Sequence, residues 1–360
     1  MKYQQTNPLP LPPTGPFEKV ASAFDSTFDW EYALKKEPLM ALYEKGKTRS
    51  WNATDIDWSI EVDLERMARD RVAMGSHEVV NQMMSPPTPL SAEQSVGMQL
   101  EINAWMISQF LHGEQGALLA TAKIVMAAPD QESKFYAANQ VADEARHVEV
   151  YHRYLTEKLG HSYEVNRHLQ TLLDDILSDS RWDMTYLGMQ IMVEGLALAA
   201  FGLMKAQMPD EPLIQDITSR IIQDEARHVA FGVLTLEDIY RNQLTSAELR
   251  EREDFVIEAT HLMRDRLLME QVYTRLDWDV PLWVDWAKHT PFMGAFRQML
   301  FSKIVPNLKR LGLLTPRVRE EYGRLGLLQF EDAPDSTMAP EVEAPEELLE
   351  LIGRIRRGTT

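Results

Sequence analysis

The chain has 360 residues, 44% of them hydrophobic, which is enough for one large domain with extensions. Its formal net charge of −18 argues against nucleic-acid binding, and the absence of cysteine excludes disulfides and cluster-binding thiolates. There is no uncharged run of 18 apolar residues and no signal-like apolar region near the N-terminus. We therefore expect a cytoplasmic protein that neither spans a membrane nor binds nucleic acid.

The N-terminal part is predicted to be irregular before it becomes helical. Residues 1–27 include a proline-rich run at 7–13 that cannot be a helix or a central strand, so we expect an extended arm. Residues 28–60 are rich in aromatic side chains, which we expect to pack as ordinary core against a helical bundle. Residues 61–82 are predicted to form one further helix, which the proline-rich segment 85–89 ends.

The next two segments predict an antiparallel pair of helices. Ser91 and Gln94 form a capping-box pattern at the start of a long apolar-periodic segment, which ends just before Pro129. Asp130 is a suitable N-cap for the following helix, which is expected to continue to about Gly160. The turn between the two helices is thus expected near residue 129.

A second pair of helices follows the same plan. One helix is predicted from about Trp182 to the break at Pro209 and Pro212, and the next from there to about Asn242. Residues 160–181 are long enough for the crossover connection between the two pairs. The remaining predictions are helices over 246–275 and 291–325, an acidic flexible linker over 331–344, and a short terminal helix over 346–357.

No segment has the pattern of a strand, so the predicted fold class is all-α, with a four-helix bundle and flanking helices. The main domain is predicted to cover residues 28–330, with its central bundle at about 91–242. The arm 1–27 precedes this domain, and the linker with its terminal helix, 331–360, follows it.

The motif Asp-Glu-Ala-Arg-His-Val occurs twice, at Asp143–Val148 and at Asp224–Val229. Residues three apart share one face of a helix, so each copy aims a glutamate and a histidine in the same direction. These pairs are Glu144 with His147, and Glu225 with His228.

Each pair has a glutamate at the same height on the opposite helix. Glu144 lies 15 residues after the first turn (144 − 129) and Glu114 lies 15 residues before it (129 − 114). Both are thus roughly 22 Å from the end of the hairpin at 1.5 Å per residue. In the second hairpin, Glu194 and Glu225 lie about 15 residues before and after the turn near residue 209 or 210.

Four glutamates and two histidines at one level of a four-helix bundle are the ligand pattern of a dinuclear metal site. Such oxygen-rich sites suit iron or manganese better than zinc or copper. A single copy of the motif would equally well be a solvated helix face, but two copies at matched heights favour metal binding. Asp143 and Asp224 are expected to hold the histidines across the bundle, Asp143 facing His228 and Asp224 facing His147. Arg146 and Arg227 either complete this arrangement or form surface ion pairs.

These residues resemble the ferritin-like diiron carboxylate superfamily, most closely the hydroxylase subunits of bacterial multicomponent monooxygenases and related diiron oxygenases. The resemblance covers about residues 91–242 and implies two iron ions, with manganese or a mixed pair as alternatives. It also implies which residues hold each ion and which bridge the two. One iron would be held by Glu114, Glu144 and His147, the other by Glu194, Glu225 and His228, with Glu144 and Glu225 as candidate bridges.

The resemblance implies an oxidoreductase, in particular a monooxygenase that uses O₂ to hydroxylate, N-oxygenate or desaturate a small organic substrate. It also implies a homodimer and an external reductase or ferredoxin as electron donor. Two positions depart from family patterns. Leu198 replaces the hydroxyl or amide residue often found in the hydroxylases, and Ile221 replaces the extra histidine of the arylamine N-oxygenases.

Two other functions remain open at this stage, a radical-generating subunit and a ferritin-like iron store. Tyr151 follows His147 by one turn, where the small subunit of ribonucleotide reductase has its radical tyrosine, and is therefore a candidate catalytic residue. The residues expected to line a substrate pocket lie one or two turns from the glutamates. They are Phe110, Ala117, Gln190, Leu198 and Phe201.

Overall fold

The structure is a computed structural model that describes residues 18–338, 350, 352–354 and 357–358. Helices account for all the regular secondary structure of these residues, and no strand occurs among them. The predicted all-α fold class is therefore confirmed.

The first predicted hairpin is formed by α4 (Ala92–Ala127) and α5 (Gln131–Tyr154). Ser91 begins α4 with the expected capping box, in which its side chain accepts from the Gln94 amide and the Gln94 side chain accepts in return. Asp130 caps α5 by accepting from the Ser133 amide. A short π-helical segment, η2 (Leu155–Leu159), extends α5 to Gly160, whose positive φ of 73° ends it.

The second hairpin pairs a composite helix with α9 (Pro212–Asn242). Glu211 caps α9 by accepting from the backbone amides of Leu213 and Ile214. The composite helix consists of three consecutive segments, and the middle segment is wound as a π-helix. The π-helical segment in the middle was not predicted. The segments are α7 (Trp182–Tyr186), the π-helical η3 (Leu187–Val193) and α8 (Glu194–Gln207).

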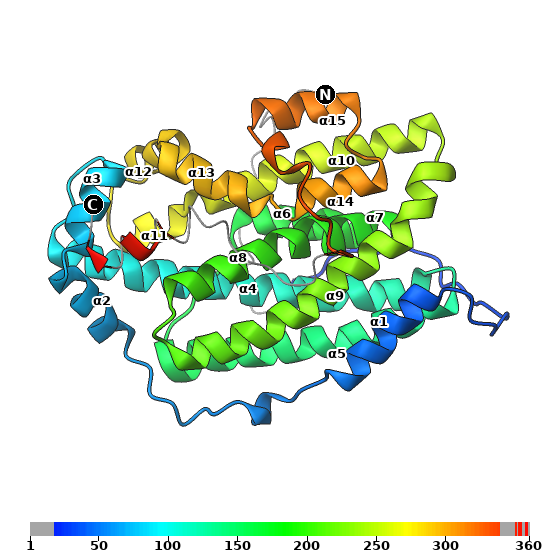
Figure 1. Cartoon of the computed structure of the whole chain (residues 1–360), viewed down its shortest axis with the longest axis horizontal. Helices are drawn as coiled ribbons and strands as arrows, with labels where there is room; N and C mark the ends of the chain where they lie inside the picture. Colours follow the sequence, from blue (N-terminus) through cyan, green and yellow to red (C-terminus); the bar gives the residue numbers. More distant parts are fainter. Residues whose placement is uncertain (1–17, 339–349, 351, 355–356, 359–360) are drawn as a thin grey trace.

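These helices form the predicted four-helix bundle, with α4 along α5, α8 along α9, and α5 against α9 (Figure 1). Two more helices cover this bundle. Helix α1 (Glu37–Thr48) lies over α5 and α9, and α6 (Arg167–Ser178) packs on α4 within the segment that was predicted only as a crossover. The largest cluster of buried apolar side chains lies between all these helices.

Several flanking helices are shorter than predicted. The single helix expected over 61–82 is divided at Gly75, whose φ of 94° breaks it into α2 (Leu64–Ala73) and α3 (Ser76–Met84). The helices expected over 246–275 and 291–325 are likewise divided into several pieces. The C-terminal pieces are α10 (Ser246–Asp265), η4 (Arg266–Leu268), α11 (Glu270–Arg275), α12 (Val280–His289), α13 (Pro291–Leu300), α14 (Ile304–Leu311), α15 (Pro316–Arg324) and η5 (Leu328–Phe330).

The aromatic N-terminal segment behaves differently from the core packing expected of it. Phe28, Trp30 and Tyr32 are 74%, 73% and 68% exposed, so the expectation is wrong for them. Trp51, which follows α1, is buried. Residues 1–17, the proline-rich part of the predicted arm, lie outside the described residues.

The predicted acidic linker lies against the bundle over its described part. Ser336 donates its amide proton to Asn307 of α14, and Asp335 accepts from Arg310 of the same helix. Residues 339–349 and most of the predicted terminal helix 346–357 lie outside the described residues.

One helix among the described residues is long and apolar enough to span a membrane by length and composition. It is the composite helix Trp182–Gln207, with a mean hydropathy of 1.6 in its most apolar window. Because 89% of that window is buried inside the protein, its apolar character is that of a central bundle helix.

Candidate metal centre

The six residues predicted as metal ligands come together in the middle of the bundle. Each has an exposed fraction of 6% or less, although they lie on four different helical segments. Their side-chain atoms form two groups, in each of which the candidate ligand atoms lie within 4.8 Å of one another. One group is Glu114, Glu144, His147 and Glu225, and the other is Glu144, Glu194 and His228.

Glu144 belongs to both groups because its two oxygens face different histidines. Its Oε2 lies 3.4 Å from Nδ1 of His147, and its Oε1 lies 3.1 Å from Nδ1 of His228. Glu225 is also placed between the histidines, with its Oε1 3.1 Å from Nδ1 of His147 and 3.5 Å from Nδ1 of His228. The two carboxylates expected to bridge a metal pair thus both lie between the two imidazoles.

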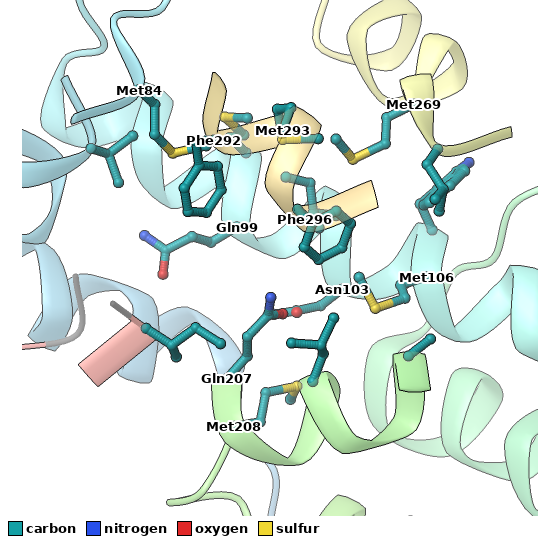
Figure 2. Close-up of a pocket in the computed structure, with 18 of the residues that line it drawn as sticks. Met84, Gln99, Asn103, Met106, Gln207, Met208, Met269, Phe292, Met293 and Phe296 are labelled. Atoms are coloured by element: carbon teal, nitrogen blue, oxygen red, sulfur yellow. The ribbon is translucent and has the colours of Figure 1, made fainter. Parts of the chain in front are cut away.

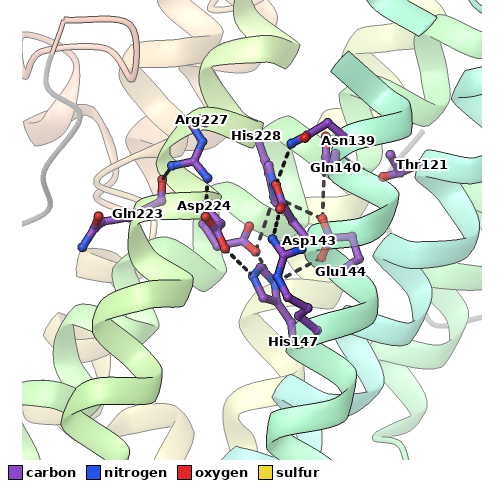
Figure 3. Close-up of polar contacts among 12 residues, drawn as sticks. Thr121, Asn139, Gln140, Asp143, Glu144, His147, Gln223, Asp224, Arg227 and His228 are labelled. Carbon is purple, nitrogen blue, oxygen red and sulfur yellow. Dashed lines mark hydrogen bonds and ion pairs between the residues drawn. The ribbon is translucent and has the colours of Figure 1, made fainter. Parts of the chain in front are cut away.

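The aspartates of the two motifs contact the histidines across the bundle. Nε2 of His147 lies 3.2 Å from Oδ2 of Asp224, and Nε2 of His228 lies 3.2 Å from Oδ2 of Asp143 (Figure 3). Each histidine therefore directs Nδ1 to the glutamates and Nε2 to an aspartate. A carboxylate at Nε2 favours the tautomer in which Nε2–H donates to it, and this tautomer leaves Nδ1 free to bind a metal.

Arg146 and Arg227 are each paired with the aspartate of their own motif. Arg146 donates to Asp143 and Arg227 donates to Asp224, three residues earlier on the same helix. Both guanidinium groups are largely buried, with side-chain exposures of 14% and 4%, so the alternative of surface ion pairs is wrong. The charge of each aspartate is thus balanced by an arginine and does not add to that of the glutamates.

The glutamate cluster fits a pair of cations. Five of its atoms are buried and have no hydrogen-bond partner among the residues that the structure describes: Oε2 of Glu144, Oε2 of Glu194, both carboxylate oxygens of Glu225 and Nδ1 of His228. Buried polar atoms of this kind are costly unless something binds them. The four carboxylates can carry four negative charges, which two divalent cations would neutralise.

Burial and mutual repulsion act on the two outer glutamates in the protein without a cation. The pKa values of Glu114 and Glu194 are both raised well above the usual range, first by burial and next by the charge of Glu225. A bound cation removes both causes, because it replaces lost hydration and offsets the neighbouring charge.

Gln140, one turn before Glu144 on α5, belongs to the site although no sequence pattern predicted it. Its side-chain amide donates to Oε1 of Glu144 and to Oε1 of Glu194, and each N···O distance is 2.9 Å. Gln140 therefore holds two carboxylates that come from different hairpins. A lone glutamine on a helix has no spacing that would have revealed this role.

Trp51 also contacts the site, although its partner Asp224 lies 173 positions further along the chain and the contact was not predicted. The Trp51 indole Nε1–H donates to Oδ2 of Asp224, with an N···O distance of 2.7 Å. The same oxygen faces Nε2 of His147. The indole ring lies nearly parallel to the His147 ring at 6.3 Å, and the guanidinium groups of Arg146 and Arg220 lie over it. Trp51 thus fixes the position of Asp224.

Replacing Trp51 by phenylalanine is expected to weaken metal binding by about 2–10-fold, because Asp224 loses one of its hydrogen bonds. The measurement is the retention of iron in competition with a chelator. Trp58→Phe is the matched control, since the Trp58 indole donates instead to the backbone oxygen of Ala53. Equal retention in both variants would show that Trp51 does not position the aspartate.

Tyr151 is fully buried beside the site. Its ring lies 5.9 Å from that of Phe110 and 6.1 Å from that of Phe201, and its hydroxyl has no hydrogen-bond partner among the described residues. Burial, together with the charge of Glu114, raises its pKa well above the usual range, so the phenol is protonated. Its catalytic role stays a prediction.

An apolar pocket lies between α3, α4, α8, α13 and η4, and its wall includes Phe110, one helical turn before Glu114. Of the residues predicted to line a pocket, only Phe110 does so. Ala117, Gln190, Leu198 and Phe201 are buried in the bundle but are not on the wall of this pocket, so their part in a substrate pocket stays a prediction. Helical spacing alone could not tell which side of each helix faces a cavity.

Comparison with known proteins gives only distant similarities. No family model and no curated protein matches the chain. Solved structures of an R2-like ligand-binding oxidase, point mutants reconstituted with a Mn/Fe cofactor, are similar to it. One is 19% identical with a TM-score of 0.42 and covers 73% of this chain and 92% of its own. Another is 18% identical with a TM-score of 0.44 and covers 81% and 95%. Similarities at this level do not identify the metal or the reaction of this chain.

Proposed function

We propose that the protein is an O₂-dependent oxidoreductase with two metal ions, and that it oxidises a small apolar organic compound. The observation that carries this proposal is the buried cluster of four glutamates and two histidines, five atoms of which have no hydrogen-bond partner among the described residues. The ions we propose are iron, with manganese in place of one or both as the alternative, because carboxylate-rich sites with imidazole suit these metals.

The residues that would hold the metals are the six of the cluster. Glu114 and His147 would bind one ion, Glu194 and His228 the other, with Glu144 and Glu225 shared between them. A bound iron pair supplies the reduction of O₂ and the oxidising power for the organic compound. The protein fixes the histidine tautomers through Asp143 and Asp224, holds the carboxylates through Gln140, and excludes water with a buried apolar surround.

The compound to be oxidised is proposed to enter the apolar pocket beside the cluster. Electrons are proposed to come from a separate reductase or ferredoxin, because the sequence lacks cysteine and a glycine-rich dinucleotide fingerprint. We also propose that the protein is a homodimer. The molecular mass measured by analytical ultracentrifugation would test this, and the mass of a monomer would contradict it.

The proposal predicts rapid oxygen uptake by the reduced, iron-loaded protein. Protein loaded anaerobically with two Fe²⁺ per chain should consume O₂ within seconds, followed with an oxygen electrode and by stopped-flow absorbance. Protein loaded with Zn²⁺, which has no redox chemistry, is the control and should consume none. Tight iron binding without oxygen uptake would contradict the proposal.

The same experiment separates the other two functions. A stable tyrosyl radical after oxygen addition, seen by electron paramagnetic resonance and absent in Tyr151→Phe, would indicate a radical-generating subunit. Continued uptake of iron far beyond two ions per chain, with formation of a mineral core, would indicate storage.

A further inference from the structure

The pocket beside the metal centre is a cavity of 240 Å³ with largely apolar walls (Figure 2). Small-molecule sites typically occupy about 300–1,000 Å³, so the cavity is slightly smaller than that range and suits a small occupant. Methionines from five segments contribute to the walls and make them adaptable, since their side chains are flexible and polarisable. They include Met84, Met98, Met106, Met208, Met269 and Met293.

The charged residues on the pocket wall are both arginines, Arg71 and Arg266. The described part of the wall contains no aspartate or glutamate, although the whole chain has a net charge of −18. The pocket thus has largely apolar walls, and the charged side chains on these walls are positive. Arg71 is already engaged in another interaction within the protein, which leaves Arg266 as the residue of interest.

Arg266 is only 6% exposed, and its Nε is buried without a hydrogen-bond partner. The neighbouring acidic groups face other cations, since Asp265 pairs with Arg264 and Glu270 with Arg167. Burial alone lowers the pKa of Arg266 to about 10, so its guanidinium stays charged at neutral pH. No hydrogen bond or ion pair from its side chain to another described residue occurs.

Other buried arginines of the chain show what is missing. The guanidinium of Arg252 donates to both carboxylate oxygens of Asp183, and each N···O distance is 3.0 Å. The guanidinium of Arg297 donates to the backbone oxygens of Ala287 and Lys288 at the end of α12. An uncompensated buried charge is costly, so the position of Arg266 at a cavity points to a partner that enters from outside.

The pocket reaches close to the metal centre. Phe110 lies on its wall, one helical turn before Glu114 on the same face of α4. One turn of helix is about 5.4 Å, so this end of the pocket lies about one turn from a candidate ligand.

We propose that this pocket binds a carboxylic acid with an extended apolar body, whose carboxylate is held by Arg266. The carboxylate would form paired hydrogen bonds with the planar guanidinium and neutralise its single charge, while the apolar body fills the methionine-rich cavity. A doubly charged phosphate would leave one charge uncompensated in the same apolar surround. That this acid is the compound oxidised rests on the proposed function, whereas its binding does not.

The test is a comparison of decanoate with 1-decanol, which has the same chain length and no charge. Binding to the iron-loaded protein would be measured anaerobically by calorimetry, for the parent and for Arg266→Met and Arg266→Lys. The parent should bind decanoate about 10–100-fold more tightly than the alcohol, and Arg266→Met should lose this preference. Arg266→Lys, which keeps the charge without the planar fork, should retain part of it.

Thermal unfolding gives a readout that a structural role would move in the opposite direction. Without ligand, Arg266→Met should unfold at a higher temperature than the parent, because an unpaired buried charge is removed. Arg252→Met is the matched control. It should unfold at a lower temperature, since Asp183 loses its partner, and should bind decanoate like the parent.

Two results would overturn the inference. One is equal affinity of the parent for decanoate and decanol. The other is parent-like decanoate binding in Arg266→Met, together with its loss in metal-free protein, which would place the carboxylate on the metals instead. Absence of oxygen uptake with intact decanoate binding would contradict the proposed function alone.

Discussion

Replacing Glu144 by alanine is expected to lower the metal content from two ions per chain to less than one. Glu144 is common to both groups of candidate ligands, and its two oxygens face His147 and His228 respectively. Its loss removes a ligand from each ion and one of the four negative charges that balance them. Metal content is measured by elemental analysis after iron loading and desalting, and oxygen uptake should fall in parallel.

Glu132→Ala is the control for this substitution. Glu132 is also a buried glutamate of α5, but it accepts from the backbone amides of Lys35 and Lys36, away from the cluster. The Glu132 variant should keep two ions per chain, while Glu194→Ala, which removes a ligand of one group only, should retain an intermediate amount. Two ions per chain in Glu144→Ala would contradict the assignment of the site.

Asp143→Asn and Asp224→Asn are expected to fold normally, to retain some iron and to lose most of the oxygen uptake. Each aspartate faces Nε2 of a histidine from the other motif, 3.2 Å away, and each is paired with an arginine. Asparagine keeps the size but loses the charge that favours the Nδ1-free tautomer. Such losses typically cost about 10–100-fold in metal affinity or activity.

Iron affinity, from chelator competition, and the rate of oxygen uptake measure this effect. Asp183→Asn is the matched control, because Asp183 is likewise buried and paired with an arginine, but it lies on α7 and its partner is Arg252 of α10. The control should lose stability without losing iron affinity. If both motif variants match the parent in affinity and rate, the aspartates do not position the histidines.

The sequence was sufficient for the bundle and for the convergence of the six residues. The reason is physical, since a hairpin of straight helices places residues at equal distances from the turn at equal heights, as Glu114 and Glu144 show. The boundaries that it predicted well were those with local signals, such as the capping box at Ser91 and the cap at Asp130. The break between α2 and α3 at Gly75 could not be predicted, because a glycine can adopt a positive φ but does not have to.

The residues that surround the candidate ligands could not be predicted from spacing. Trp51 reaches Asp224 from an irregular segment 173 positions away, and nothing in its neighbourhood marks it. Gln140 is one of many polar residues of α5, and Arg266 is distinguished only by having no side-chain partner within the described part of the chain. Such roles depend on long-range packing, which one sequence does not reveal.

The π-helical segment η3 has a consequence for the length of its helix. Each residue of an α-helix turns the chain by about 100°, so one residue more or fewer rotates everything beyond it. Glu194, at one end of η3, faces the candidate metal site, and Asp183, before its other end, pairs with Arg252 and accepts from Tyr240. The wider winding allows both ends to keep their partners in one continuous helix. The residue count between Asp183 and Glu194 is therefore as constrained as the identity of either side chain, and a single deletion there would disconnect one end from its neighbours.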